Sequence, residues 1–222
     1  MGGVAGERRR GEPQLGLRER KKQRTRAAIS DTAIALFLAH GFDNVSVVQV
    51  AAAAEVSKRT LFAYFPTKED LVLHRIADHE QESADVVRAR PAGESPLDTL
   101  HQHFLDGLRR RDPITGLTAD PEPLAIYQML TTTPSLALRL RHYLTRSEDA
   151  LGGALLETVD ALRPLTARLA AAQITIVQRT LAEDTSRQLV SGADADHLHP
   201  HAVTAANHAF TLLRTGLASS LS

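Results

Sequence analysis

Apolar residues recur at intervals of three and four along almost the whole chain, which is the period of an amphipathic α-helix. Between residues 29 and 37, Ile29, Ala33, Leu36 and Phe37 fall on one helical face in this way. Strict alternation of apolar and polar positions, which is typical of half-buried strands, is nearly absent. The pattern therefore predicts an all-α protein of about nine helices.

Residues suited to helix ends divide the N-terminal third into short helices. Ser46 with Gln49 three positions later has the form of a capping box, and Ser57 is a good N-cap for the helix that follows. Thr67 caps a further helix, and Gly41 is a typical helix stop. The expected helices here are residues 17–40, a short one beginning at Ser46, 58–64 and 67–88.

In the rest of the chain, three dipeptides join a capping residue to a proline at the first helical position. They are Ser95–Pro96, Asp120–Pro121 and Thr133–Pro134. The pair Gly152–Gly153 interrupts a long helical pattern and predicts a kink. The last three helices are expected over residues 134–162, 164–190 and 200–217, with a loop over 191–196.

The segment SVVQVAAAAEVSKRTLFAYFPTKEDL, from Ser46 to Leu71, has the pattern of a helix-turn-helix. One face of the first short helix is apolar or small, and Ala51 and Ala54 let a second helix cross it steeply. The second short helix directs Leu61 and Phe65 inward. In such a unit the second helix enters the major groove of DNA, and its N-terminal residues meet the base edges.

The residues at the start of that second helix carry the chemistry that base recognition requires. Arg59 can donate two hydrogen bonds to guanine, and Thr60 can contact a base or a thymine methyl group. Tyr64 can donate its hydroxyl to a phosphate, and Lys68 can add a charge contact at the next helix start. The alternative interpretation is a pair of surface helices with solvated charges.

The stretch from about Arg24 to Leu73 resembles the TetR family of regulators in three motifs: HGFDNVSV, VAAAAEVSKRTLFAYF and PTKEDL. The resemblance implies a DNA-binding head on a helical body that dimerises and binds a ligand. It also assigns the DNA-binding residues one by one. They are Arg24, Ser46, Ser57, Lys58, Arg59, Thr60, Phe62, Ala63, Tyr64 and Lys68.

Two residues depart from the pattern of that family. Glu55 stands in the turn, where the family commonly has glycine. A left-handed backbone at a residue with a side chain costs about 1 kcal/mol, so we expect the turn to differ slightly. Ala63 stands where a larger side chain is common, and we expect one base or phosphate contact fewer.

The charge distribution supports a polyanionic partner for the N-terminal part. The whole chain has a formal net charge of zero, but residues 1–70 contain 12 basic and 8 acidic residues. Residues 1–26 alone contain nine basic and three acidic residues. A solvated basic tail would show the same count. The expected domains are a disordered basic arm over 1–17, a helix-turn-helix domain over 18–66, and a ligand-binding and dimerisation domain over 67–222.

By the same resemblance, the protein is expected to be a homodimer that binds a palindromic double-stranded operator and is released by a small effector. The dimer would form through the last two helices, along the stripes Leu169, Ala172, Ile176, Thr180 and Leu181, and Val203, Ala206, Phe210 and Leu213. Candidate effector-binding residues are Phe104, Leu108, Leu124, Tyr127, Gln128, Leu140, Tyr143 and Leu151. Because aromatic residues are scarce, we expect an aliphatic pocket suited to a lipophilic or acyl-type molecule.

Other functional classes are less well supported. The chain has no cysteine and none of the common phosphate-loop, dinucleotide, serine-hydrolase or metalloprotease motifs, so neither an enzyme nor a cofactor is expected. A metal-responsive regulator would use His197, His199 and His201, with His101 and His103 as a second pair, but we expect no metal site. A transcriptional activator and a ligand-independent DNA binder remain alternatives. A cytoplasmic location is expected.

Overall fold

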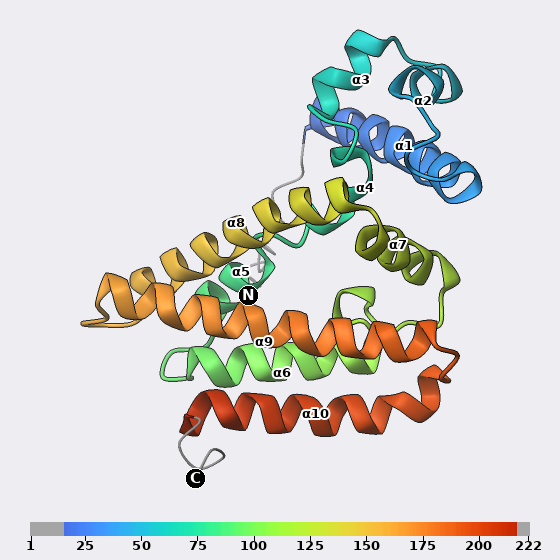
Figure 1. Cartoon of the computed structure of the whole chain (residues 1–222). Coiled ribbons are helices and arrows are strands. Elements are labelled where there is room, and N and C mark those ends of the chain that lie inside the picture. The colour runs from blue at the N-terminus through green and yellow to red at the C-terminus, as the bar shows by residue number, and fades with distance from the viewer. Residues whose placement is uncertain (1–15, 217–222) are drawn as a thin grey trace, which may run out of the picture.

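The computed structural model describes residues 16–216, which form ten α-helices, one short 3-10 helix and no strand (Figure 1). The all-α prediction is thereby confirmed. The helices are α1 (Leu17–His40), α2 (Val47–Ala53), α3 (Lys58–Tyr64), α4 (Asp70–Ala77), α5 (Glu82–Ala89), α6 (Pro96–Arg110), η1 (Pro113–Thr115), α7 (Pro121–Thr132), α8 (Pro134–Thr158), α9 (Pro164–Val190) and α10 (Ala195–Thr215). The predicted arm over residues 1–17 lies almost wholly outside the described residues.

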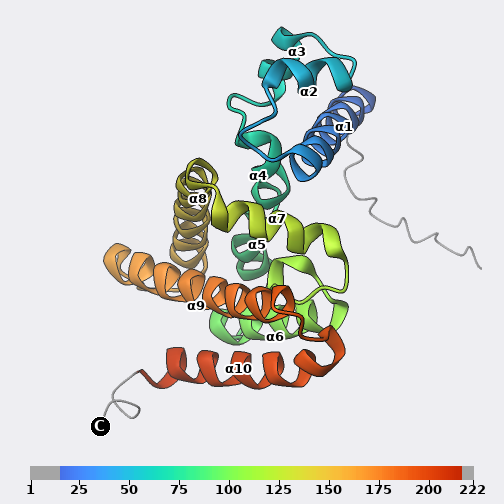
Figure 2. The same cartoon turned by 45° about the vertical axis from the view of Figure 1, so that its right-hand side comes forward.

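The helices form a small head and a larger body. Helices α1, α2 and α3 stand at one end of the molecule, and α6, α9 and α10 lie at the other end (Figures 1 and 2). Helix α9 packs against α8 and α10, and α10 packs against α6. Helix α4 leads from the head into the body and contacts both α1 and α8. Any change of the body that moves α4 will therefore also move the head.

Two apolar cores hold these parts together. The first contains residues of the head, such as Phe37, Leu61 and Phe65, and continues through α4 to Leu130 and Leu136 of α7 and α8. The second core lies among α5, α6, α8, α9 and α10. Because the first core crosses the predicted boundary at residue 67, the head and the near side of the body are packed as one unit.

The single helix predicted over residues 67–88 is instead two helices, α4 and α5. The residues between them form hydrogen bonds of three-residue spacing: the amides of His79, Glu80 and Glu82 donate to the carbonyls of Ile76, Ala77 and His79. This tighter winding breaks the α-helical pattern without a proline or glycine, so no residue type in the segment signals it. Thr67 still receives a hydrogen bond at the helix start, from the Asp70 amide at 3.3 Å.

The ends of two later helices also differ from the prediction. Helix α8 ends at Thr158, four residues early, because Val159 is extended and Ala161 adopts a left-handed backbone with φ of 57°. Helix α10 begins at Ala195 and contains Pro200, although the start was expected at that proline. The Asp194 carboxylate caps the helix by accepting hydrogen bonds from the amides of Asp196 and His197.

Candidate nucleic-acid interface

Helix α2 is anchored at its start by the capping box that the sequence predicts. The Ser46 hydroxyl accepts a hydrogen bond from the Gln49 amide at 3.3 Å, and the Gln49 side chain accepts one from the Ser46 amide at 2.8 Å. Val50 and Ala51 are buried against the rest of the head. The apolar face of α2 is therefore turned inward as predicted, and its start faces solvent.

Helix α3 separates an inner face from an outer face. Leu61 within it and Phe65 at its end are fully buried in the head core. The exposed residues of the outer face are Lys58, Arg59, Phe62 and Ala63. Phe62 retains 39% of its surface, which is a large exposed fraction for an aromatic residue outside a binding surface. The outer face of α3 therefore presents two cationic side chains and one aromatic ring to solvent.

Two hydroxyl groups at the start of α3 are already partnered. The Ser57 Oγ accepts from the Thr60 amide at 3.0 Å and lies 2.8 Å from the Thr60 Oγ1. Each hydroxyl keeps one further hydrogen-bonding position, because a hydroxyl can donate once and accept twice. Lys58 and Arg59 have no such intramolecular bond among the described residues, so they are the freest donors on this helix.

The turn between α2 and α3 keeps a left-handed residue although that residue is not glycine. Glu55 has φ of 53°, which costs about 1–2 kcal/mol for a residue with a Cβ atom. Glu55 thus adopts the left-handed backbone that the sequence analysis treats as costly for a residue with a side chain. The surrounding contacts hold the turn: the Val56 amide donates to the Ala51 carbonyl at 2.9 Å.

The remaining predicted contact residues lie around the head at different depths. Ser46 and Arg24 are exposed, and Tyr64 is half-buried against the head core. Lys68 is also half-buried. Its ammonium group donates to the Phe42 carbonyl at 2.5 Å and lies 4.3 Å from the centre of the Phe42 ring. This arrangement fixes the position of the Lys68 charge and leaves part of its donor capacity unused.

A buried ionic cluster fastens the start of α4 to α8, and sequence reasoning did not find it. The Asp70 carboxylate accepts hydrogen bonds from Arg139 at 2.8 and 3.1 Å and from the Tyr143 hydroxyl at 2.9 Å. Burial alone would raise the pKa of Asp70, but these bonds and one from Thr67 outweigh it and lower the pKa. The sequence shows only that Asp70 stands in the first turn of a helix. The helix dipole favours an acidic residue there whether or not it has an ionic partner.

Arg75 forms a second connection between head and body. Its guanidinium group donates to Asp31 of α1 at 2.8 Å and to Glu122 of α7 at 2.5 Å. The hydroxyl of Ser30 in α1 adds a buried bond to the carbonyl of Leu71 in α4 at 2.7 Å. Because these contacts join three elements far apart in the sequence, they set the orientation of the head on the body.

Most of the eight candidate effector residues are divided between the two cores. Tyr143 and Leu140 belong to the core shared with the head, whereas Phe104, Leu108, Leu124 and Leu151 belong to the core of the body. Tyr127 donates its hydroxyl to the Glu183 carbonyl at 3.3 Å, and Gln128 is exposed. A Cβ atom added at Gly152 would meet the Ala171 side chain at 3.8 Å, which is an ordinary contact. Helix α8 runs through Gly152 and Gly153 without a break.

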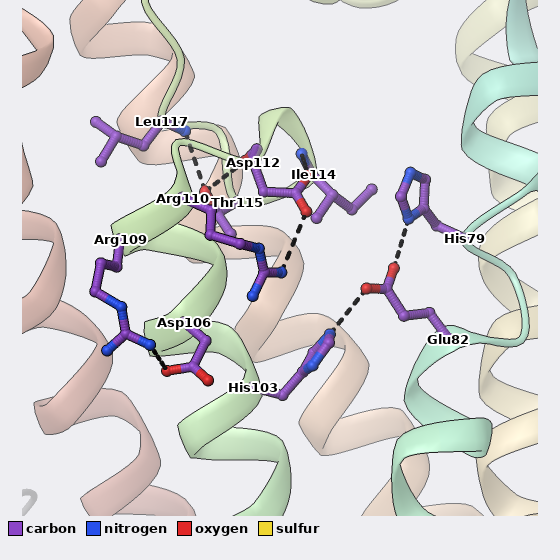
Figure 3. A network of polar contacts seen from close by, with 10 residues as sticks. All are labelled: His79, Glu82, His103, Asp106, Arg109, Arg110, Asp112, Ile114, Thr115 and Leu117. Carbon is purple, nitrogen blue, oxygen red and sulfur yellow. Dashed lines mark hydrogen bonds and ion pairs between the residues drawn. The ribbon is translucent and has the colours of Figure 1, made fainter. Parts of the chain in front are cut away.

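A polar cluster joins the turn after α4 to α6. Figure 3 shows the Glu82 carboxylate between the rings of His79 and His103, at 2.5 Å from the first and 2.8 Å from the second. Hydrogen bonds from His103 and His79 hold the pKa of Glu82 far below its ordinary value. The hydrogen bond to Glu82 raises the pKa of His79.

These shifts predict that part of the stability depends on pH. The contribution of His79 is complete below its unfolded pKa of about 6.5 and is lost as pH rises through its raised folded pKa. The contribution of Glu82 is present above its unfolded pKa and is lost only in strong acid. We expect the free energy of unfolding to fall above pH 6.5 by on the order of 0.5 kcal/mol, because both groups are partly exposed. Urea titrations of wild type and His79→Gln from pH 6 to 8.5 measure this.

The exposed His208 supplies the control for this experiment. His208→Gln should leave the pH dependence of wild type in place, whereas His79→Gln should flatten it. An unchanged dependence in His79→Gln would show that the pair does not control stability in this range.

Three of the histidines considered for metal binding, His197, His199 and His201, lie in the first turns of α10. His197 is exposed and 3.5 Å from Asp194, and no group of three or more metal-ligating residues comes together within residues 16–216. His101 stacks on Phe210 and lies 3.0 Å from Asn207, and His103 contacts Glu82. The two predicted histidine groups are thus separate.

The two predicted dimer stripes differ in exposure. On α9, Leu169 and Ile176 are 53% and 42% exposed, and they face away from the body core. On α10, Ala206 and Phe210 are fully buried, so this half of the prediction describes packing within the chain. A surface hollow of about 510 Å³ lies between α9 and α10. A second hollow beside it is lined by Ile176, Val177, Thr180, Leu181 and Ala209.

The head and part of the body are similar to known regulatory proteins. Residues 29–74 match the family described as bacterial regulatory proteins of the tetR family. The chain is also 37% identical over 138 residues to the HTH-type transcriptional regulator TcmR of Streptomyces glaucescens, which is 62% of this chain and 60% of that protein. Residues 29–74 are a domain of the tetR family. The matched region contains the α2–α3 unit and the start of α4.

Two further comparisons bear on the TetR fold. The chain is 35% identical over 107 residues to the HTH-type transcriptional repressor KstR of Rhodococcus jostii, covering 47% of this chain and 49% of that protein. The structure of the regulator FadR from Bacillus subtilis, solved with stearoyl-CoA, superposes with a TM-score of 0.52 at 18% identity. That match covers 86% of this chain and 98% of FadR, and shows that the folds are alike.

The matched regions of TcmR and KstR span about 60% and about half of those proteins. Matches of 138 and 107 residues are longer than the head, so the similarity in sequence extends from the head into the body. No helix described by the structure has the length and apolar character needed to cross a bilayer.

Proposed function

We propose that this protein is a ligand-responsive transcriptional regulator that represses its target genes by binding a palindromic operator. The observation that carries the proposal is the exposed outer face of α3. There Arg59 and Lys58 face solvent at the first turn of the helix, while Leu61 and Phe65 are fully buried behind them. In a helix-turn-helix this is the position from which side chains reach base edges in the major groove.

The test is binding of DNA from the upstream region of the gene, followed by fluorescence anisotropy, for wild type and Arg59→Ala. Loss of a bidentate contact with guanine costs about 1–3 kcal/mol, so we expect affinity for each half-site to fall about 5- to 150-fold. Arg163→Ala, which removes an exposed arginine from the far end of the body, is the matched control. If wild type shows no preference for this DNA, or if Arg59→Ala binds as wild type does, the assignment of α3 is wrong.

We further propose that the protein works as a homodimer formed through the exposed face of α9 and the adjoining part of α10. Leu169 and Ile176 lie seven residues apart, which places them on one side of α9. Two copies would place their heads on half-sites about 34–36 Å apart, one turn of the duplex.

We expect Ile176→Glu to weaken the dimer, because the new charge would be buried in an apolar interface without a partner. Light scattering after size exclusion should show a monomer at micromolar concentration, and operator affinity should fall with it. Leu138→Glu places the same charge at a residue of α8 that is 71% exposed and lies on another face, and should leave the mass unchanged. A dimer of Ile176→Glu would place the interface elsewhere.

The effector is proposed to be a small lipophilic molecule bound in the body. The core of the body is built almost wholly from aliphatic side chains, among them Leu100, Leu108 and Leu151, so a ligand that entered it would be surrounded by apolar groups. Such a ligand weakens DNA binding only if it prefers a conformation of the body in which the distance between the two heads no longer matches the distance between the two half-sites. A preference of about 5.5 kcal/mol moves the population from nearly all bound to nearly all released. The contacts of Asp70 and Arg75 are the route by which the body would move the head.

A further inference from the structure

The bend between α4 and α5, residues 78–81, joins the two apolar cores. Helix α4 contributes Leu71 and Leu73 to the core that includes the head, whereas α5 contributes Ala84 and Val87 to the core of the body. The backbone of the bend is held by hydrogen bonds of three-residue spacing, which have poorer geometry than those of an α-helix. This bend is therefore a place at which one core can turn relative to the other.

Two acidic side chains tie the bend to different helices. The Glu80 carboxylate is 8% exposed and lies 2.9 Å from the guanidinium group of Arg146 in α8. Glu82, the first residue of α5, lies 2.8 Å from the ring of His103 in α6 and 2.5 Å from the ring of His79 in the bend (Figure 3). These side chains thus hold the bend to α8 and to α6.

The two ties respond differently to protons. An arginine guanidinium group does not lose its charge in a protein, so the pair of Glu80 and Arg146 is ionic throughout the neutral range. Glu82 is paired with two histidines, and histidine is the side chain whose charge changes most readily between about pH 5 and 8. The tie to α6 is therefore the one that a change of pH near neutrality alters.

The charges that face His79 favour its protonated form. The hydrogen bond to Glu82 raises the pKa of His79, burial lowers it, and the charges of Asp112 and Asp78 raise it further. Asp112 follows α6, where Arg110 lies 3.6 Å from its carboxylate and offsets part of that effect. The net shift is upward, so the proton stays on His79 above the ordinary pKa of a histidine.

We propose that His79, Glu82 and His103 form a proton-dependent latch, which holds the bend against α6 and thereby fixes the head on the body. Protonated histidines donate charge-assisted hydrogen bonds to Glu82, and such bonds are roughly twice as strong as neutral ones. As pH rises and the histidines lose their charge, the latch weakens and the bend opens more often. The inference goes beyond the proposed function, since it needs neither DNA nor an effector.

The first test is amide hydrogen exchange of the full chain between pH 6 and 8.5, with the rates corrected for the intrinsic effect of pH. The protection of the amides of residues 79–82 should fall about two- to fivefold over this range, as expected when a partly exposed ion pair is lost. The amide of Ile174, a buried residue of α9, serves as the internal reference.

The substitution His79→Gln separates the latch from other effects of pH. Glutamine can still donate to Glu82 but does not titrate, so the protection of the bend should then be nearly independent of pH. His208→Gln changes an exposed histidine of α10 and should keep the profile of wild type. The proposal is overturned if the protection of the bend in wild type does not change relative to Ile174, or if it changes equally in His79→Gln.

The second test measures whether the latch controls the head. The chain has no cysteine, so Asp43→Cys attaches one spin label to an exposed position of each head. In the proposed homodimer, pulsed electron–electron double resonance gives the distance between the two labels in samples frozen at pH 6 and at pH 8.5. The distribution of distances should be wider at pH 8.5. With His79→Gln added, its width should be the same at both pH values.

Equal widths at both pH values without the substitution of His79 would overturn the link between the latch and the head. If no dipolar signal is found, the proposed dimer fails, which is a different result. A second label at Arg163→Cys, an exposed position directly before α9, then gives the distance between head and body within one chain. The same widening at pH 8.5 is expected for that distance, and its absence overturns the link.

Discussion

Asp70→Ala should lower the free energy of unfolding by about 3 kcal/mol, because removing one partner of a buried ion pair leaves the others without compensation. Asp70 is 3% exposed and is bonded to Arg139, Tyr143 and Thr67. The loss should stay at the lower end of the usual range, since the Arg139 side chain is 32% exposed and can be rehydrated. Urea denaturation at one fixed protein concentration measures it.

Two comparisons separate the ion pair from other effects of that substitution. Asp70→Asn keeps the shape and some hydrogen bonds, so it should lose less stability than Asp70→Ala. Asp78→Ala removes a largely exposed carboxylate from the end of the same helix and should change stability by no more than about 0.5 kcal/mol. Equal losses in Asp70→Ala and Asp78→Ala would mean that the cluster with Arg139 and Tyr143 contributes little.

Gly116→Ala should also destabilise the protein strongly, by about 3 kcal/mol. Gly116 has φ of +79°, and a Cβ atom there would lie 2.0 Å from the backbone oxygen of Ala182 in α9. The left-handed backbone costs about 1–2 kcal/mol for alanine, and displacing a helix backbone from its packed position adds about 1–3 kcal/mol. The melting temperature and the urea midpoint should both fall.

Gly192→Ala is the matched control, since Gly192 has φ of +98° and nothing within 4 Å of an added Cβ atom. It should show the cost of the left-handed backbone alone, about 1–2 kcal/mol. The difference between the two variants then measures the clash with α9. If the two variants lose equal stability, the close approach of η1 to α9 is not a constraint on the fold.

The helix positions and helix caps could largely be predicted from neighbouring residues in the sequence. Apolar periodicity and end residues place the helices, because helix formation and capping depend on residues within four positions of each other. Ser46 with Gln49, and Ser57, cap α2 and α3 as expected. The outer face of α3 follows from the same period once Leu61 is assigned to the core.

Two helix boundaries were predicted wrongly from local sequence signals. The bend between α4 and α5 contains neither proline nor glycine. Pro200 was expected to start a helix that in fact begins five residues earlier, at Ala195, with Asp194 as its cap. At α10 the deciding contact is local, since the Asp194 carboxylate caps the helix, whereas the bend after α4 has no residue type that marks it. The effector candidates are divided between two cores, because periodicity shows that a residue is buried but not which core receives it.

The sequence by itself determined the all-α class, the helix-turn-helix and the excess of positive charge at the N-terminal end, because each depends on local order and composition. Only the tertiary structure decided that Asp70 meets Arg139 and that Arg75 joins Asp31 to Glu122, since these partners lie 44 to 69 positions apart. It also decided which charges stay unpaired. Pairing depends on the distances between folded elements, and no pattern within one helix records them.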